Sequence, residues 1–273
     1  MDRYLARDAD GRALLGDADG HVPLASADPS LRTVDDALAR AHAGLPDPGA
    51  ATATRVPADQ TRFASPLANP GKLLGIGLNY ADHAADLDEN SPDEPASFFK
   101  PASAATGPGG PIRLPPDSES ERVTAEAELA VVIGRTCRNV DPDEVEDVVA
   151  GYLPVIDMTA EDVLQRNPRF LTRAKSYDTF LVLGPRLVGA GGELPPADTA
   201  VRTVVNGEVV AENTVANMHF SPRELVAVHS RVMTLEPGDL ISTGTPGAHP
   251  IVPGDPVRAE VDGVGTVSAD VVR

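Results

Sequence analysis

The sequence predicts an α+β fold built around a mixed β-sheet. Segments with strand-like patterns outnumber helix-like ones, and the two kinds do not alternate strictly along the chain. The 24 glycines and 26 prolines are spread through the 273 residues, as expected for breaks between many short elements. A doubly wound parallel sheet requires regular alternation of strands and helices, so it is disfavoured.

The N-terminal part predicts a small unit of its own. Asp-Gly pairs at 10–11 and 19–20 are typical of hairpin turns. The stretch 44–70 has many breakers and little apolar periodicity, which indicates an extended connection. We therefore expect a small N-terminal domain with its linker over residues 1–65 and a larger domain over 66–273.

The larger domain contains the clearest element patterns. Strands are predicted where apolar or alternating runs are bounded by turn residues, at 72–77, 124–134, 152–157 and 239–243. Helices are predicted where capping patterns begin, over 141–150, from 159 onward, and over 221–233. Hairpins are predicted at the Asn-Gly pair 206–207, which joins strands 201–205 and 209–211, and around 262–263.

Composition limits the partners of the chain. Its 41 acidic and 23 basic residues give a net charge of −18, which repels phosphate backbones and anionic headgroups. Neither nucleic acid nor a membrane is therefore an expected partner. The single cysteine, Cys137, cannot form an internal disulfide, and no signal-peptide or membrane-span pattern is present. These features predict a cytoplasmic protein.

Three acids are candidates for a shared site. Glu126 and Glu128 are two residues apart on a predicted strand, so their side chains project from the same face. Asp157 ends the next predicted strand. Three carboxylates without histidine or cysteine suit a hard cation such as Mg²⁺ or Mn²⁺. A solvated strand face and a carboxylate acid/base pair remain alternative interpretations.

Other polar residues add candidates around these acids. His83 and Asp86 are three residues apart, so on a helix they share a face and could form a base with its orienting acid. Lys175 is one of only three lysines, and its ammonium could stabilise an enolate or oxyanion in a dry site. A surface lysine without a catalytic role is the alternative interpretation. The loop 242–247 could offer hydroxyl and backbone N–H groups to a carboxylate.

Taken in order, several short motifs resemble those of the fumarylacetoacetate hydrolase family over about residues 70–273. The motifs that carry the resemblance are Gly75-Ile-Gly-Leu-Asn-Tyr-Ala-Asp-His83, Phe99-Lys100-Pro101, Glu126-Ala-Glu128, Asp157-Met-Thr-Ala, Ala174-Lys175-Ser176, Asn206-Gly207 and Leu235-Glu-Pro-Gly-Asp-Leu-Ile-Ser-Thr-Gly-Thr-Pro246. The resemblance makes 66–273 the catalytic domain and implies a mixed-sheet α+β roll, usually a homodimer. It also implies Mg²⁺ or Mn²⁺, with Ca²⁺ as a further option, on Glu126, Glu128 and Asp157.

The same resemblance implies roles for further residues. Catalytic roles fall to His83, Asp86 and Lys175, and substrate-binding roles to Tyr80, Lys100, Gln165 and Thr245. The implied reaction is hydrolysis of a C–C bond in 1,3-diketo acids of the acylpyruvate or fumarylpyruvate type. The metal would chelate the 2-oxo acid end, His83 would activate water, and Lys175 would stabilise the departing pyruvate enolate.

Three departures from the family pattern concern the part that would bind substrate. Relatives often carry Glu where this chain has Asp86, and Arg where it has Glu161, and Gln165 comes one position late. The acidic segment 82–95 is predicted to act as a lid. Decarboxylation of an oxaloacetate-type diacid, isomerisation of a 2-hydroxyhepta-2,4-diene-1,7-dioate type of substrate, and a non-enzymatic scaffold remain alternatives.

Overall fold

The computed structural model describes residues 3–80 and 93–273 and confirms the α+β class. Among these residues, one large mixed sheet contains β1 (Tyr4–Asp8), β2 (Ala13–Asp17), β3 (Gly20–Pro23), β4 (Phe63–Ala64), β5 (Leu73–Gly77), β6 (Ala96–Lys100), β7 (Ala105–Thr106), β9 (Val123–Ile133), β10 (Val149–Ala160), β11 (Leu181–Leu183), β12 (Arg186–Gly189), β15 (Leu240–Ser242) and β16 (His249–Ile251). A second sheet contains β8 (Ile112–Arg113), β13 (Ala200–Val205), β14 (Glu208–Thr214), β17 (Pro256–Val261) and β18 (Gly265–Val272). The described α-helices are α1 (Leu24–Ala27), α2 (Val34–Ala41), α4 (Glu161–Arg166), α5 (Leu171–Lys175) and α6 (Pro222–Val232).

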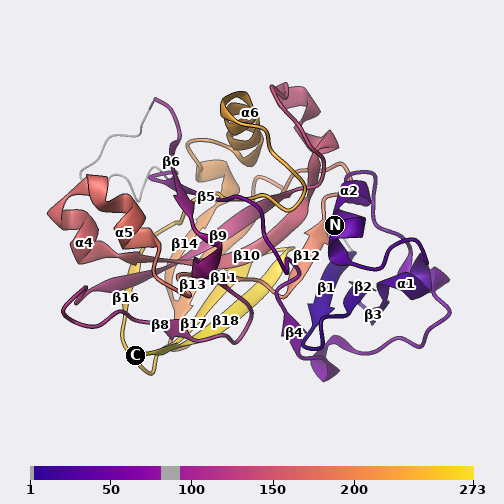
Figure 1. The fold of residues 1–273 in the computed structure, drawn as a ribbon, viewed down its shortest axis with the longest axis horizontal. Helices are drawn as coiled ribbons and strands as arrows, with labels where there is room; N and C mark the ends of the chain where they lie inside the picture. Colours follow the sequence, from indigo (N-terminus) through magenta and orange to yellow (C-terminus); the bar gives the residue numbers. More distant parts are fainter. Residues whose placement is uncertain (1–2, 81–92) are drawn as a thin grey trace.

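The two longest strands form the centre of the molecule. The main path of the large sheet runs β3-β2-β1-β12-β10-β9-β15-β5-β6, and the second sheet packs against β9 and β10 (Figure 1). Every residue of β9 and β10 is buried, because both faces of this strand pair are covered. The hydroxyl of Thr203 on β13 accepts a hydrogen bond of 3.0 Å from the backbone N–H of Ala127, which joins the two layers. Side chains on this pair are therefore held in a rigid, dry interior.

Two helix predictions need correction. The capping pattern at 141 begins only a short 3₁₀ turn, Pro142–Asp147, and β10 begins at Val149. The helix expected from 159 begins at Glu161, since Thr159 and Ala160 still pair with β9. In both places the apolar run of β10 gains a long ladder of backbone hydrogen bonds, which outweighs a local cap worth about 1 kcal/mol. Asp157 consequently lies inside a strand rather than at its end.

The N-terminal strands continue the large sheet rather than forming a separate one. β1 pairs antiparallel with β12 and with β2, and the hairpins predicted around 10–11 and 19–20 are present. In Figure 1 these strands, in indigo, lie at the opposite end of the molecule from α4 and α5. The division at residues 65 and 66 stays a prediction. Within the described chain, no helix is long and apolar enough to cross a bilayer.

Candidate metal centre and active site

Glu126, Glu128 and Asp157 come together on one face of the β9–β10 pair. Glu126 and Glu128 alternate on β9, and Asp157 lies directly opposite Glu126 in the antiparallel register. One carboxylate oxygen from each residue can be chosen so that all lie within 4.8 Å of one another. The residues are at most 6% exposed, which rules out the solvated-face interpretation.

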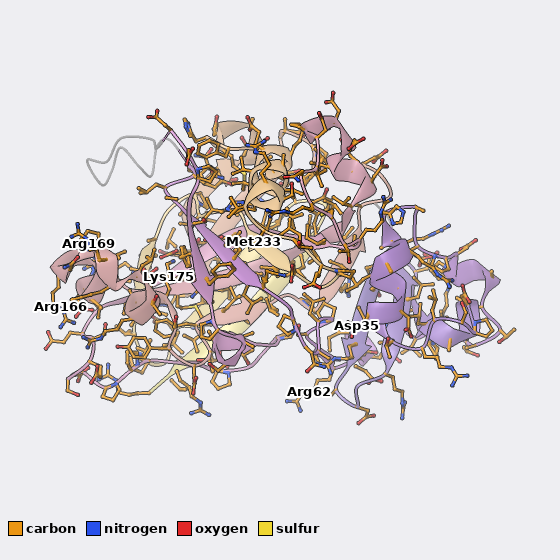
Figure 2. The ribbon with its side chains drawn as sticks, turned by 45° about the horizontal axis from the view of Figure 1, so that its top comes forward. Asp35, Arg62, Arg166, Arg169, Lys175 and Met233 are labelled. Atoms are coloured by element: carbon orange, nitrogen blue, oxygen red, sulfur yellow. The ribbon has the colours of Figure 1, made fainter. Side chains whose placement is uncertain are left out.

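Two buried lysines contact this cluster. Lys175, the last residue of α5, places its Nζ 2.8 Å from Glu126 Oε2 and 3.4 Å from Asp157 Oδ2. Lys100, the last residue of β6, places its Nζ 2.5 Å from Asp157 Oδ1. In Figure 2 Lys175 lies among the strands, whereas Arg166 and Arg169 lie at the outer edge of the molecule. The site therefore holds three carboxyl groups against two ammonium groups.

The two ammonium groups do not fully compensate the three carboxyl groups, as the directions of the pKa shifts indicate. Burial, followed by the charge of Asp157, raises the pKa of Glu128 to about 8. Burial also raises the pKa of Asp157, despite the two ammonium groups beside it. Burial alone would raise the pKa of Glu126 too, but its contact with Lys175 lowers it. Without a further cation, the cluster favours keeping one carboxyl protonated, because a third negative charge in this buried site would be uncompensated.

The residues present fit a bound divalent cation. Both oxygens of Asp157 are buried and accept no well-formed hydrogen bond from the described residues, although two ammonium groups lie nearby. A small hard cation takes carboxylate oxygens as ligands and favours their ionised form. Glu126, Glu128 and Asp157 could therefore hold Mg²⁺ or Mn²⁺, with the remaining coordination positions left for water or a ligand.

Hydroxyl and backbone groups orient the glutamates. Glu126 Oε1 accepts hydrogen bonds from the hydroxyls of Thr159 and of Thr124, the latter at 3.2 Å. Glu128 Oε2 accepts from the hydroxyl of Ser242 and from the backbone N–H of Gly244 at 2.8 Å. The loop 242–247 therefore donates hydrogen bonds to a carboxylate, which is that of Glu128. Such bonds fix ligand geometry before a metal binds.

Lys100 is tied to the protein rather than open to a ligand. Its Nζ donates to the carbonyl oxygens of Met158 at 3.2 Å, Lys175 at 2.7 Å and Phe180 at 2.7 Å. These three carbonyl oxygens account for all three ammonium hydrogens, and Asp157 lies beside the ammonium as an ion-pair partner. The contacts favour a role in positioning Asp157 and Lys175 over the substrate contact that the resemblance implied.

The other predicted site residues differ in their surroundings. The hydroxyl of Tyr80 is buried without a hydrogen-bond partner among the described residues, and burial, with the charge of Glu128, raises its pKa. Gln165 is exposed, and its Nε2 donates to Glu161 Oε1 at 3.1 Å. Thr245 donates through Oγ1 to the carbonyl of Gly247 at 2.9 Å. His83, Asp86 and most of the predicted lid lie outside the described residues, so their roles stay predictions.

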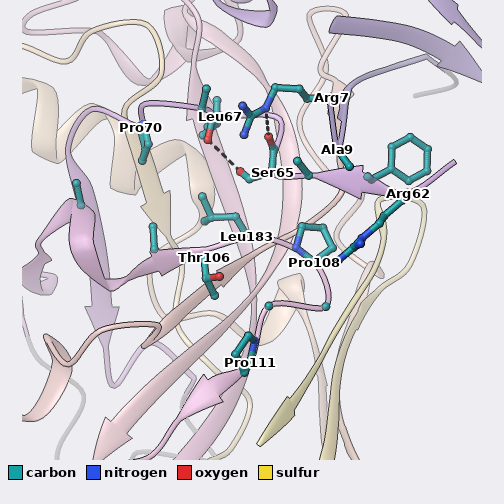
Figure 3. Close-up of a pocket in the computed structure, with 18 residues that line it drawn as sticks. Arg7, Ala9, Arg62, Ser65, Leu67, Pro70, Thr106, Pro108, Pro111 and Leu183 are labelled. Atoms are coloured by element: carbon teal, nitrogen blue, oxygen red, sulfur yellow. Dashed lines mark hydrogen bonds between the residues drawn. The ribbon is translucent and has the colours of Figure 1, made fainter. Parts of the chain in front are cut away.

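A separate hollow of about 630 Å³ lies between the N-terminal strands and the loop 102–111 (Figure 3). Arg7 and Arg62 are among its lining residues. The Nε of Arg7 donates a hydrogen bond of 2.9 Å to the carbonyl oxygen of Ser65. None of the three acids and neither buried lysine lines it. This hollow and the charged cluster are thus different places, and the candidate chemistry belongs to the cluster.

Sequence reasoning missed the residues that support the cluster. Thr124 carried a usable signal, because it precedes Glu126 by two residues and so shares its strand face. Thr159 carried no local signal, since it reaches Glu126 only through strand pairing. Ser242 belongs to the loop that the sequence singled out, but its partner Glu128 could not be predicted because it lies on a strand distant in sequence.

Comparisons with known proteins agree with this geometry. Residues 72–272 match the family model described as fumarylacetoacetate (FAA) hydrolase, C-terminal. The oxaloacetate tautomerase fahd2 of Xenopus laevis is 39% identical over 217 residues, which cover 76% of this chain and 67% of that protein.

Two solved structures are similar over nearly their whole length. A 2-hydroxyhepta-2,4-diene-1,7-dioate isomerase from Mycobacterium marinum is 32% identical, with a TM-score of 0.76 over 100% of this chain and 99% of that one. A maleylpyruvate hydrolase from Sphingobium sp., in complex with manganese(II) and pyruvate, is 33% identical, with a TM-score of 0.78 over 98% of each chain. Members of this family are enzymes, among them hydrolases and isomerases. The chain belongs to the fumarylacetoacetate hydrolase family.

Proposed function

We propose that this protein is a divalent-metal-dependent hydrolase that cleaves a C–C bond in 1,3-diketo acids of the acylpyruvate or fumarylpyruvate type. The observation that carries the proposal is the buried Glu126–Glu128–Asp157 cluster with the Nζ of Lys175 2.8 Å from Glu126. The similar maleylpyruvate hydrolase, whose complex contains manganese and pyruvate, supports the same chemistry.

Each residue of the site would have its own role in the reaction. Glu126, Glu128 and Asp157 would hold the metal, which when bound would act as a Lewis acid on the 2-oxo group. Lys175, fixed in a dry site by Glu126 and Asp157, would oppose the negative charge that develops on the leaving enolate. Preorganised charge of this kind contributes typically 10²–10³-fold to kcat. His83, oriented by Asp86, would remove a proton from the attacking water.

Two alternatives on the same site keep specific support. The alternative of oxaloacetate-type decarboxylation is supported by a bifunctional isomerase/decarboxylase relative and by the oxaloacetate substrate of the Xenopus relative, and the isomerase alternative is supported by the Mycobacterium marinum neighbour. Both chemistries need an enolate beside the metal and Lys175, but neither needs an activated water. They therefore differ from hydrolysis in their dependence on His83.

The test follows from that difference. Wild-type protein and the His83→Ala variant are assayed with acetylpyruvate and fumarylpyruvate for pyruvate release, and with oxaloacetate for decarboxylation. The proposal expects the variant to lose hydrolysis by at least about 10²-fold while metal-driven decarboxylation persists. Hydrolysis that survives the substitution would refute the assigned base. In parallel, Mg²⁺ with oxalate, an enolate mimic, should raise the Tm; a native-state site that gains no stability at saturating ligand would favour the scaffold alternative.

A further inference from the structure

The metal cluster is one part of a longer polar row on the β9–β10 pair. In an antiparallel ladder, directly opposed residues share a face, and every second pair shares it again. The acid pair Glu126–Asp157 is followed on that face by Thr124–Thr159. The backbone N–H of Glu161 donates to the carbonyl of Arg122 at 2.9 Å, which extends the same register by one further pair.

Arg122 and Glu161 therefore occupy the next position on the face that carries the metal ligands. Arg122 and Glu126 are four residues apart, so their Cα atoms are separated by about 13 Å at ~3.3 Å per residue. Both side chains project from the same face, so one ligand could contact both charged groups. The Thr124–Thr159 pair lies between them on that face.

The contacts of Arg122 leave part of its guanidinium available. Its Nε is ion-paired with Glu161 Oε2, and the other oxygen of Glu161 accepts from Gln165 Nε2 at 3.1 Å. The terminal nitrogens Nη1 and Nη2 make no hydrogen bond or ion pair with the described residues, and the side chain is 53% exposed. Glu161 thus holds the guanidinium by one edge and leaves the other edge open. That open edge has the fork geometry that binds a carboxylate bidentately.

We propose that Arg122, positioned by Glu161, binds a second carboxylate at the far end of the substrate, so that the site prefers dianionic 2-oxo acids over monoanionic ones of the same chain length. The proposal rests on the proposed function, because the metal must first hold the 2-oxo acid end. It also explains how a chain with a charge of −18 can recognise a dianion: the metal and Arg122 supply positive charge at the two ends of the ligand.

The direct test measures binding rather than turnover. Dissociation constants for 2-oxoheptanedioate and 2-oxoheptanoate, which differ only in the far carboxylate, are measured with Mn²⁺-loaded protein by calorimetry. A bidentate charged contact predicts that the wild type binds the dianion about 10- to 100-fold more tightly. Arg122→Gln should remove this preference, whereas Arg122→Lys should keep part of it as a single point charge.

Arg166→Gln is the matched control. Arg166 is exposed to the same degree and is also ion-paired with a carboxylate, that of Asp162. It is the last residue of α4 and lies at the outer edge of the molecule (Figure 2). The control should leave the preference intact. A preference that survives Arg122→Gln, or that Arg166→Gln removes equally, overturns the proposal.

Two further outcomes separate this proposal from the proposed function. Equal binding of both acids to the wild type overturns the role of Arg122 and leaves the metal-bound 2-oxo acid intact. Failure of both acids to bind the Mn²⁺-loaded wild type overturns the 2-oxo acid site and the role of Arg122 with it. Unchanged thermal unfolding of Arg122→Gln without ligand would show that a lost preference does not come from a damaged fold.

Discussion

Replacing Glu128 with glutamine should separate metal binding from folding. The pKa of Glu128 is raised to about 8, first by burial and then by Asp157, so without metal the protonated form of this carboxyl is favoured at pH 7. Glutamine is close in shape to the protonated acid, and its carbonyl oxygen can accept the hydrogen bonds from Ser242 and Gly244. The metal-free variant should therefore lose no more than about 1 kcal/mol of stability.

The response to metal should differ strongly between the two proteins. A cation that binds only the folded wild type at 100 times its Kd adds about 2.7 kcal/mol. For a chain of this size that corresponds to a rise in Tm of roughly 5–10 °C. Glu128→Gln lacks the third carboxylate and should show little of this rise.

Glu126→Gln is the contrasting variant. The Lys175 ammonium lowers the pKa of Glu126 against the effect of burial, so this carboxyl is charged and paired even without metal. Breaking a buried pair typically costs about 3–5 kcal/mol, so Glu126→Gln should unfold more easily before any metal is added. The assay is thermal unfolding of the three proteins with chelator and with Mn²⁺. Equal destabilisation of the two variants without metal, or a full Mn²⁺ response in Glu128→Gln, would refute this reasoning.

Three further predictions use the same cluster. Glu128 must lose its proton before it binds a cation, so the apparent affinity for Mn²⁺ should rise about tenfold per pH unit up to pH ~8 and level off above it. Calorimetric titration with Mn²⁺ from pH 6 to 9 measures this dependence, and an affinity that does not change with pH would contradict it. Lys175→Met should lower kcat by about 10²–10³-fold while Mn²⁺ still binds, and an unchanged kcat would remove Lys175 from the mechanism. Lys100→Met leaves Asp157 and three carbonyl groups without their buried partner, so urea unfolding should report a loss of about 3–5 kcal/mol, and a loss below 1 kcal/mol would show that Lys100 does not hold this region together.

The strand period accounts for what could be predicted at the site. Glu126 and Glu128 share a face because side chains alternate along a strand, and this holds whatever the strand's neighbours are. That period also predicts the position of Thr124. The α+β class followed from the same kind of local reasoning, because the short apolar runs could be read without any knowledge of their pairing.

Long-range register accounts for what could not be predicted. Asp157 lies opposite Glu126 because β10 and β9 pair in one particular register, and a shift of one residue would turn Asp157 to the other face. Lys100 meets Asp157 only through the folding of β6 near the end of α5. The helix predicted from 141 is only a 3₁₀ turn, and the helix predicted from 159 begins two residues later, because in both places a local cap competes with a ladder that sequence patterns do not reveal.

The most direct test of the account is the product formed from fumarylpyruvate. Chelator-treated protein is mixed with fumarylpyruvate, Mn²⁺ is then added, and pyruvate is measured against the loss of the enol absorbance, with Glu128→Gln as the control. We expect no reaction before Mn²⁺ is added and one molecule of pyruvate for each molecule of enol lost after the addition. The Glu128→Gln variant should release no pyruvate. Loss of the enol without pyruvate, or release of pyruvate that does not depend on Mn²⁺, would contradict a metal-dependent hydrolase.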